Sequence, residues 1–385
     1  MKFLFLLENY NWYYTNYYNA NNTFEKKTYT EQLESLIVQQ YYQSDSIGNS
    51  LKEHNISSNY IIPHCYPLQK SWAKENNIVM YLKWLCGKPL RSIKARVFGK
   101  MDTYQAIAEK TLLHQIKEIK PDVLYIHSGI WLEKNVIQKI KLNCKLLILQ
   151  WSCSIGNWTT FPFESFDLIC TSSNSIQKHF IQKNINTHFL QQAVEKRTLL
   201  NTTDNKERTK NIVFIGSVHP SIHKKRVSIL NFLLEHISID ISCPDSDTNE
   251  LSTKNIMLHK NGCVGGKEMF ETYKKYKVAL HIPGDEFLAD AGAKRLFEVT
   301  GSGTMLLTLH QENISEYFEI GKELATFTDE NDCLQKINYY LQHQYELQKI
   351  AEAGRIRTLK EHTFENRAKQ LLDIINKTSR YKQSI

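Results

Sequence analysis

Two charged side chains three residues apart, Arg295 and Glu298, form the pair in this sequence best suited to binding a phosphorylated ligand. They lie within residues 289–307, where small residues lead into a short helical pattern, two glycines and an apolar, β-prone run. The segment therefore predicts loop, helix, turn and strand in that order. Because residues three apart share one face of a helix, a phosphate-binding cation and a hydroxyl-binding carboxylate would point the same way.

The start of this predicted helix would add an anion site. A helix that begins near Gly292 turns its unpaired backbone N–H groups and its positive dipole end toward the incoming loop, and Lys294 adds a full charge beside Arg295. Asp290 precedes Glu298 with seven residues between them. The alternatives are an ordinary surface ion pair between Arg295 and Glu298, and a helix N-cap at Asp290.

A second candidate phosphate site follows the strand-like run of residues 211–215. Gly216 and Ser217 end this run in a small-residue turn, and His223 and Arg226 come soon after it. In a doubly wound sheet, phosphates bind where the first strand ends in such a turn. Arg226 could instead be a surface charge at the start of a helix.

Strand-like apolar runs alternate with helical segments along the whole chain, which predicts parallel sheets in α/β layers. The runs cover residues 3–7, 123–127, 146–151, 168–171, 212–216, 237–242, 278–282 and 305–309. A polar stretch separates the first four from the last four. We therefore expect a first domain over residues 1–195, a linker over 196–210 and a second domain over 211–363. A final amphipathic helix over 364–385 is long enough to cross back to the first domain.

Length, charge and cysteine content limit the possible functions. With 385 residues the chain exceeds the usual size of one hydrophobic core, so two domains are expected. The formal charge of +8 indicates an anionic partner, but no nucleic-acid-binding motif accompanies it, so nucleic acid is not expected. The eight cysteines include no C-x-x-C pair, which indicates reduced thiols in a cytoplasmic protein and no zinc site.

One stretch concentrates the positive charge. Residues 83–100 contain six lysines and arginines, no acidic residue, and interleaved apolar side chains. Two interpretations stand: a solvated basic helix face, or a patch that rests on an anionic membrane. The N-terminal apolar run is interrupted by Glu8, so we interpret it as the first strand and not as a signal peptide.

The last third of the chain resembles the C-terminal domain of CgeB-like glycosyltransferases. The resemblance depends on the order and spacing of residues 295–307, 313–318, 321–323, 350–354 and 361–368. It implies the α/β GT-B fold, in which two Rossmann-like domains face each other across a cleft and the second domain holds a nucleotide-sugar. The N-terminal half resembles the family much less.

The resemblance assigns roles to single residues. It implies that Glu298 binds the ribose hydroxyls, that Arg226 binds the diphosphate, and that the loop containing Cys263 and Val264 lies against the nucleobase, although its glycines could simply form a turn. Asp290 takes the first position of the E-x7-E pattern of retaining enzymes. Because Asp replaces Glu there, both its role and the stereochemical outcome stay open.

The proton acceptor is expected in the first domain. His127 ends a strand-like run and is followed by Ser128 and Gly129, which places its imidazole at the carboxyl end of a sheet. Asp45 is the rival base for an inverting reaction. A hydrogen-bonded structural histidine and a helix-capping aspartate are the respective alternatives.

Together these features predict a cytoplasmic, hexosyltransferase-like glycosyltransferase that uses neither a metal nor another cofactor. Its donor would be a UDP- or GDP-sugar and its acceptor a glycan, a lipid-linked sugar or a protein, in surface glycan or glycoconjugate synthesis. Peripheral contact with the inner face of the membrane would accompany this activity if the basic stretch binds lipid. The alternative is a catalytically silent carbohydrate-binding or coat-assembly protein on the same fold.

Overall fold

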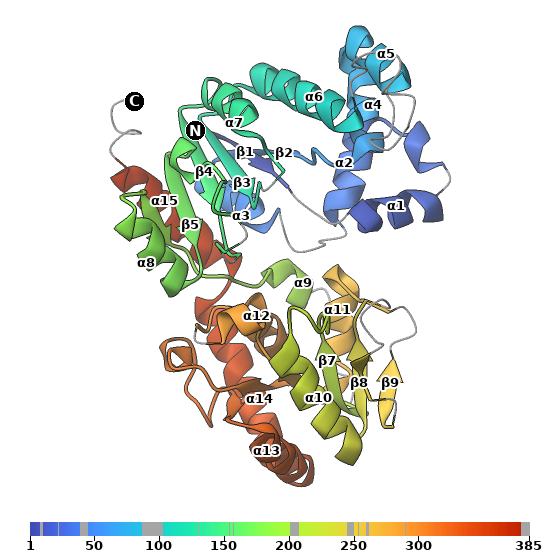
Figure 1. The fold of residues 1–385 in the computed structure, drawn as a ribbon, viewed down its shortest axis with the longest axis vertical. Helices are drawn as coiled ribbons and strands as arrows, with labels where there is room; N and C mark the ends of the chain where they lie inside the picture. The colour runs from blue at the N-terminus through green and yellow to red at the C-terminus, as the bar shows by residue number, and fades with distance from the viewer. Residues whose placement is uncertain are drawn as a thin grey trace. The chain divides into compact units, whose positions relative to one another are not determined.

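Figure 1 presents the protein as a computed structural model, with two sheets flanked by helices. The structure describes residues 1–7, 11–21, 23–38, 45–86, 103–129, 131–153, 155–156, 158–200, 208–244, 250–252, 254–258, 262–288 and 290–378. Two compact units divide the chain. The first comprises Met1–Thr171, Ile176–Phe189 and Ala368–Ile385, and the second comprises Ser172–Ser175 and Leu190–Arg367.

The first unit contains a six-stranded parallel sheet in the order β2-β1-β3-β4-β5-β6. Its strands are β1 (Lys2–Leu6), β2 (Ser57–Ile61), β3 (Val123–His127), β4 (Leu146–Gln150), β5 (Leu168–Thr171) and β6 (Thr187–Phe189). The helices of this part of the chain are α1 (Asn11–Ala20), α2 (Tyr29–Val38), α3 (Ser46–Ser50), α4 (Tyr66–Asn76), α5 (Ile78–Cys86), α6 (Tyr104–Ile119), α7 (Lys134–Lys141) and α8 (Asn174–Gln182). The inner strands are almost wholly buried, as expected for a parallel sheet covered on both faces.

The second unit contains another six-stranded parallel sheet, in the order β12-β11-β10-β7-β8-β9. Its strands are β7 (Lys210–Ile215), β8 (Ile239–Ser242), β9 (Ile256–Leu258), β10 (Tyr276–His281), β11 (Met305–Leu309) and β12 (Ala325–Phe327). The helices are α9 (Lys196–Leu200), α10 (Lys224–His236), α11 (Gly266–Tyr273), α12 (Lys294–Gly301), α13 (Glu330–Gln342), α14 (Gln344–Glu361) and α15 (Phe364–Lys377), whose last residues group with the first unit. This is the Rossmann strand order, so the crevice for a ligand opens between the carboxyl ends of β7 and β10.

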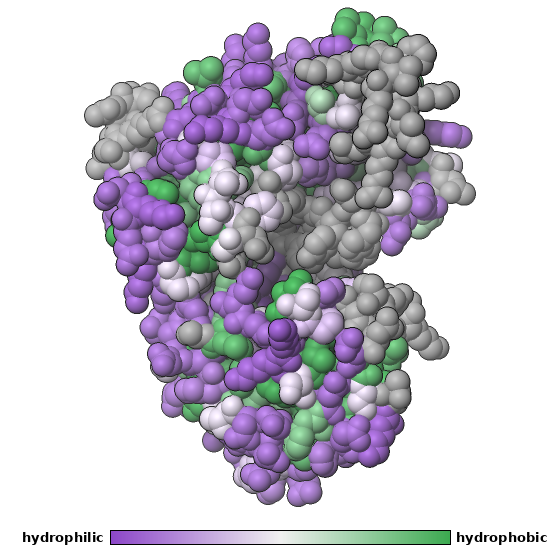
Figure 2. All heavy atoms as spheres, in the orientation of Figure 1, coloured by the Kyte–Doolittle hydropathy of each residue, from purple (hydrophilic) through white to green (hydrophobic). Residues whose placement is uncertain are grey.

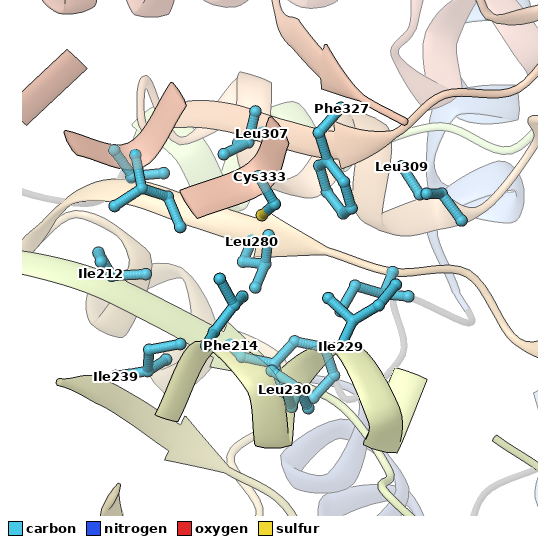
Figure 3. Close-up of a cluster of buried hydrophobic side chains, with 14 of the residues drawn as sticks. Ile212, Phe214, Ile229, Leu230, Ile239, Leu280, Leu307, Leu309, Phe327 and Cys333 are labelled. Atoms are coloured by element: carbon cyan, nitrogen blue, oxygen red, sulfur yellow. The ribbon is translucent and has the colours of Figure 1, made fainter. Parts of the chain in front are cut away.

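Alternation along β7 builds the two faces of the second core. Phe214 packs with Leu230 of α10, Leu280 of β10 and Leu307 of β11 on one face, and Figure 3 shows these side chains converging. Val213, the residue before Phe214 on β7, points to the opposite face of the sheet, where a second cluster includes side chains of α11 and α12. The second unit takes up the chain from Leu190, before the polar stretch 196–210, because Val194 and Leu199 are buried in this second cluster.

Small residues bring α12 close to α14. The hydroxyl oxygens of Thr300 and Thr358 lie 2.6 Å apart. A Cβ atom on Gly301 would lie 3.0 Å from the Leu199 side chain, and one on Gly354 would lie 2.2 Å from the carbonyl oxygen of Glu323. Neither glycine can be enlarged without moving its neighbours, so Gly301 fixes α12 against Leu199 and Gly354 fixes α14 against the Glu323 backbone.

Arg208 also holds the C-terminal end of α12. Its guanidinium donates hydrogen bonds to the carbonyls of Tyr273, Tyr276, Ser302 and Gly303 and to the Thr304 hydroxyl. Burial lowers the pKa of Arg208 to about 10. The residue therefore ties the end of α12 to the entries of β10 and β11.

Candidate functional site

The predicted helix after Asp290 is present, but it starts two residues later than expected. Its N-cap is Ala293 and its first residue is Lys294. A Cβ atom on Gly292 would lie 2.6 Å from the carbonyl oxygen of Ser172, so close backbone packing explains this glycine. Ala293 offers no side-chain cap, which leaves the positive end of the α12 dipole to the loop and to whatever binds there.

Glu298 is held on this helix by two cations. Its carboxylate lies 2.5 Å from Nη1 of Arg295 and 4.0 Å from Nζ of Lys294. The side chain of Glu298 is only 4% exposed, whereas those of Arg295 and Lys294 are 27% and 21% exposed. Arg295 and Glu298 therefore lie on one face of α12 as predicted, and their ion pair is partly buried, unlike an ordinary surface ion pair.

Arg226 lies at the crevice between β7 and β10. Its Nε donates to the carbonyl of Ile282, just after β10, at 2.9 Å, and its Nη1 donates to the carbonyl of Ser217, just after β7, at 2.6 Å. The guanidinium carbon also lies 5.7 Å from the centre of the Phe214 ring. Because carbonyl oxygens are its acceptors, the charge of Arg226 remains available to an anion.

A second arginine and a neutral histidine accompany Arg226. Burial lowers the pKa of Arg226 to about 10, and the charge of Arg295 lowers it further while Asp285 opposes the change. Burial and then both arginines lower the pKa of His281 to about 3. The His281 ring, which is neutral at pH 7, has its Nδ1 2.9 Å from the Thr308 hydroxyl. Positive charge therefore concentrates where a doubly wound sheet binds its ligand.

The other predicted site residues that follow β7, Gly216, Ser217 and His223, lie near Arg226. A Cβ atom on Gly216 would lie 3.9 Å from Nη1 of Arg226, and Ser217 supplies one of the arginine's acceptors. His223 is the N-cap of α10, and its ring would lie 3.2 Å from a Cβ atom on Gly284. These residues therefore line the carboxyl ends of β7 and β10 around Arg226.

The loop with Cys263 and Val264 is anchored by Ser242 at the end of β8. The Ser242 hydroxyl donates to the carbonyl of Gly262 at 2.8 Å and accepts from the backbone N–H of Val264 at 3.0 Å. The Val264 side chain is buried in the core, while Cys263 is half-buried. Gly262 has a φ of 61°, so it does form a turn.

Asp290 makes hydrogen bonds away from α12. Its carboxylate accepts from the hydroxyl of Ser173 at 2.6 Å, from the backbone N–H of Ser175 at 3.2 Å and from the side-chain amide of Asn313 at 3.1 Å. It is therefore not the N-cap of α12. Asn313 also binds both backbone groups of Ala291, so it helps to hold the loop before the helix.

His127 ends β3 beside the switch point of the first sheet, which lies between β1 and β3. The next two residues, Ser128 and Gly129, both have a φ of 64°. A left-handed serine is uncommon and strained, so the backbone turns sharply directly after the histidine. The half-buried ring of His127 lies 5.1 Å from that of Tyr125.

Asp45 precedes α3 and is 3% exposed. Its side chain does not cap the helix, although its carbonyl accepts from the N–H of Asn49 at 2.8 Å. The hydroxyl of Tyr60 on β2 also donates to that carbonyl, at 3.4 Å. Asp45 therefore belongs to the edge of the first sheet at β2.

Sequence reasoning missed His281 and gave Asn313 no role. No motif surrounds His281, which lies inside a strand-like run; only the strand order shows that it ends beside Arg226. Asn313 begins one of the segments that carry the family resemblance, and that position could have marked it as a candidate site residue.

Residues 87–102, most of the basic stretch, lie outside the described residues. Within the described ranges, no helix is both long enough and apolar enough to cross a membrane. In the same part of the chain, no three His, Cys, Asp or Glu side chains gather so as to hold a metal ion.

Residues 226–373 match a family model described as glycosyl transferase-like. No curated protein matches the sequence. Among solved structures, a glycosyltransferase from Rickettsia africae superposes with a TM-score of 0.56 at 11% identity, covering 99% of this chain and 98% of that one.

Two further structures show the same fold. Anabaena HepE in complex with UDP and glucose has a TM-score of 0.56 at 11% identity and covers 98% of this chain and 100% of its own. A sucrose-phosphate synthase from Thermosynechococcus elongatus has a TM-score of 0.55 at 9% identity, covering 86% and 91% of the two chains. With its two parallel sheets, the chain has the GT-B fold.

Proposed function

We propose that this chain, whose residues 226–373 match a family model described as glycosyl transferase-like, transfers a sugar from a nucleotide-sugar to an acceptor. The observation that carries the proposal is the charge arrangement at the crevice of the second sheet. Arg226 and Arg295 are close enough for one to lower the pKa of the other, and Glu298 is paired with Arg295. A diphosphate beside a ribose offers the complementary pattern, anionic oxygens next to hydroxyl donors.

The diphosphate binds to Arg226, Arg295 and the uncapped start of α12. Negative charge grows on this group as the sugar–phosphate bond breaks, and fixed cations with backbone N–H groups stabilise that charge. We therefore propose that the transfer is independent of a metal. The ribose hydroxyls donate to Glu298, and the loop around Cys263 and Val264 contacts the base.

We assign the proton transfer to the first unit, where His127 and Asp45 are rival bases. His127 is favoured by its position at the switch point of the first sheet, where ligands of doubly wound proteins bind. Asp290 receives a positioning role, because its carboxylate already accepts hydrogen bonds from Ser173, Ser175 and Asn313.

A UDP-sugar is our first choice of donor, because Anabaena HepE has been crystallised with UDP-glucose. We place the reaction in the cytoplasm and the acceptor among glycans, lipid-linked sugars and proteins of surface glycan or glycoconjugate synthesis.

Helix α5 favours a lipid-linked acceptor at an anionic membrane. Ile78, Val79, Leu82 and Leu85 are 64%, 62%, 52% and 52% exposed on one side of α5, and Figure 2 shows hydrophobic residues at the position of this helix. The basic stretch begins at Lys83, within α5, and continues beyond the helix in the sequence. Apolar side chains next to cations suit the interface of an anionic bilayer.

The second candidate is a carbohydrate-binding protein without catalytic activity. It is favoured by Asp290, which replaces the glutamate of the E-x7-E pattern and has its carboxylate engaged by neighbours. Turnover separates the two candidates, since only the enzyme releases a nucleoside diphosphate from its donor.

The test is a panel of UDP- and GDP-sugars in a thermal unfolding assay, followed by measurement of nucleoside diphosphate release. A ligand at 100 times its Kd should stabilise the folded state by about 2.7 kcal/mol. Stabilisation with slow release of the diphosphate supports the enzyme, and stabilisation without any release supports the binding protein. A panel that leaves the unfolding midpoint unchanged contradicts both.

A further inference from the structure

Gln191 is a buried amide with no hydrogen-bond partner for either polar atom among the residues that the structure describes. The residue is 6% exposed, and both Nε2 and Oε1 are shielded. Its neighbours Leu190 and Ala193 are also buried, at 2% and 0%. Burying an amide without a hydrogen-bond partner destabilises the folded state, so proteins rarely keep such an amide without a use for it.

The amide of Gln191 lies at the entrance to α12. Its Nε2 would be 3.9 Å from a Cβ atom on Gly292, two residues before the helix. The next residue, Gln192, is different, because its Nε2 donates to the Ser172 hydroxyl at 3.3 Å and its carbonyl accepts from Nε of Arg367. Of two adjacent glutamines, the one beside the anion site is the one without partners.

The chemistry of the amide selects the group that it can bind. A phosphate oxygen only accepts and would satisfy Nε2 alone, leaving Oε1 buried and unpaired. A sugar hydroxyl both donates and accepts, so one or two hydroxyl groups satisfy the whole amide.

We infer that Gln191 binds hydroxyl groups of the sugar that is transferred, an inference that rests on the function proposed above. Ribose, diphosphate and sugar follow one another along a nucleotide-sugar. Glu298 lies four residues after Lys294, the first residue of α12, about 6 Å along the helix. With ribose at Glu298 and diphosphate at Arg226 and Arg295, the sugar reaches the start of α12, where Gln191 lies.

Gln191→Met tests the inference, because it keeps the length of the side chain and removes both polar atoms. Affinity for UDP-glucose should fall about five- to hundredfold, the loss of two hydrogen bonds, while affinity for UDP stays within about twofold. GDP-mannose and GDP replace these probes if the panel selects GDP. The unfolding midpoint of the ligand-free variant should stay equal or rise, since an unpaired buried amide is gone.

Gln192→Met is the matched control and should lower the unfolding midpoint without changing the ratio of UDP-glucose to UDP affinity. A Gln191→Met protein with a lower midpoint and an unchanged ratio would mean that a buried water or the protein itself satisfies the amide, and the inference would be wrong. If Gln191→Met does not fold, Gln191→Asn, which withdraws the amide by one methylene, must give the same change in the ratio. Wild-type protein that binds neither UDP nor GDP overturns the proposed function, and an unchanged ratio with normal UDP binding overturns only the role of Gln191.

Discussion

Glu298→Gln separates the ribose contact from the structural ion pair. The substitution keeps the shape of a side chain that is 4% exposed and removes the charge that accepts from Arg295 and that, in the proposed function, accepts from the ribose. A hydrogen bond to a charged group contributes about 1.5–3 kcal/mol, so affinity for UDP should fall roughly 10- to 150-fold. Uridine, which has the same ribose, should lose affinity by a similar factor.

The free protein should lose some stability as well. Exposed ion pairs contribute about 0–1 kcal/mol, and breaking a buried one costs about 3–5 kcal/mol. The pair with Arg295 is intermediate, since the carboxylate is buried but the guanidinium side chain is 27% exposed. We expect a loss of about 1–3 kcal/mol in urea unfolding.

Calorimetric titration with UDP, uridine and pyrophosphate checks the assignment. Pyrophosphate has no ribose, so its affinity should stay nearly constant in Glu298→Gln. The control is Glu352→Gln, at an exposed glutamate on α14, which should change neither binding nor stability. If uridine binding is unaffected, or if pyrophosphate binding falls as much as UDP binding, Glu298 does not hold the ribose.

Three further predictions follow from buried glycine, buried histidine and surface charge. Gly354→Ala should destabilise the protein by about 1–3 kcal/mol or more in urea unfolding, because its Cβ would lie 2.2 Å from the Glu323 carbonyl oxygen. The control on the same helix, Glu352→Ala, should change the free energy of unfolding by less than about 0.5 kcal/mol. Burial lowers the pKa of His362 to about 4, below its unfolded value near 6.5. The stability that a neutral His362 contributes should therefore be complete above pH 6.5 and fall by about 3 kcal/mol as the pH drops to 4. Unfolding that is independent of pH over this window would contradict a neutral His362. The protein should co-sediment with vesicles of anionic lipid at low salt. A variant with glutamine at Lys88, Arg91, Lys94 and Arg96 should not co-sediment, and its affinity for UDP should be unchanged. If the wild-type protein does not bind these vesicles, the basic stretch is a solvated face.

The central strands were predictable from sequence and the edge strands were not. All eight apolar runs contain a strand, and these eight include every inner position of both sheets. The four strands without a prediction, β2, β6, β9 and β12, are the outermost strands of the two sheets. A strand with one neighbour is partly exposed or very short, as in β2 and β9, so it lacks the continuous apolar run that marks an inner strand.

The candidate site divides in the same way, by distance along the chain. Arg295 and Glu298 could be placed together because one helix turn sets their relation. His281 and Gln191 could not, because strand order places His281 at the crevice, and packing against Gly292, far away in the sequence, places Gln191 at the entrance to α12. Such contacts leave no local periodicity, and a buried amide without partners becomes visible only when its surroundings are known.

Asp290 shows why a one-methylene departure from a motif changes the interpretation of a site. Its carboxylate stays close to its own backbone, within reach of Ser173, Ser175 and Asn313, and Asn313 in turn binds both backbone groups of Ala291. The loop that leads into α12 is therefore held on both sides by hydrogen bonds that a longer glutamate could not make from the same backbone position. Because Gly292 also packs against the Ser172 carbonyl, the start of α12 is placed by polar contacts and close packing together. Under the proposed function, Asp290 therefore preorganises the start of α12 as an anion site and does not reach the sugar, so we assign the sugar contact to Gln191, whose buried amide has no partner among the described residues.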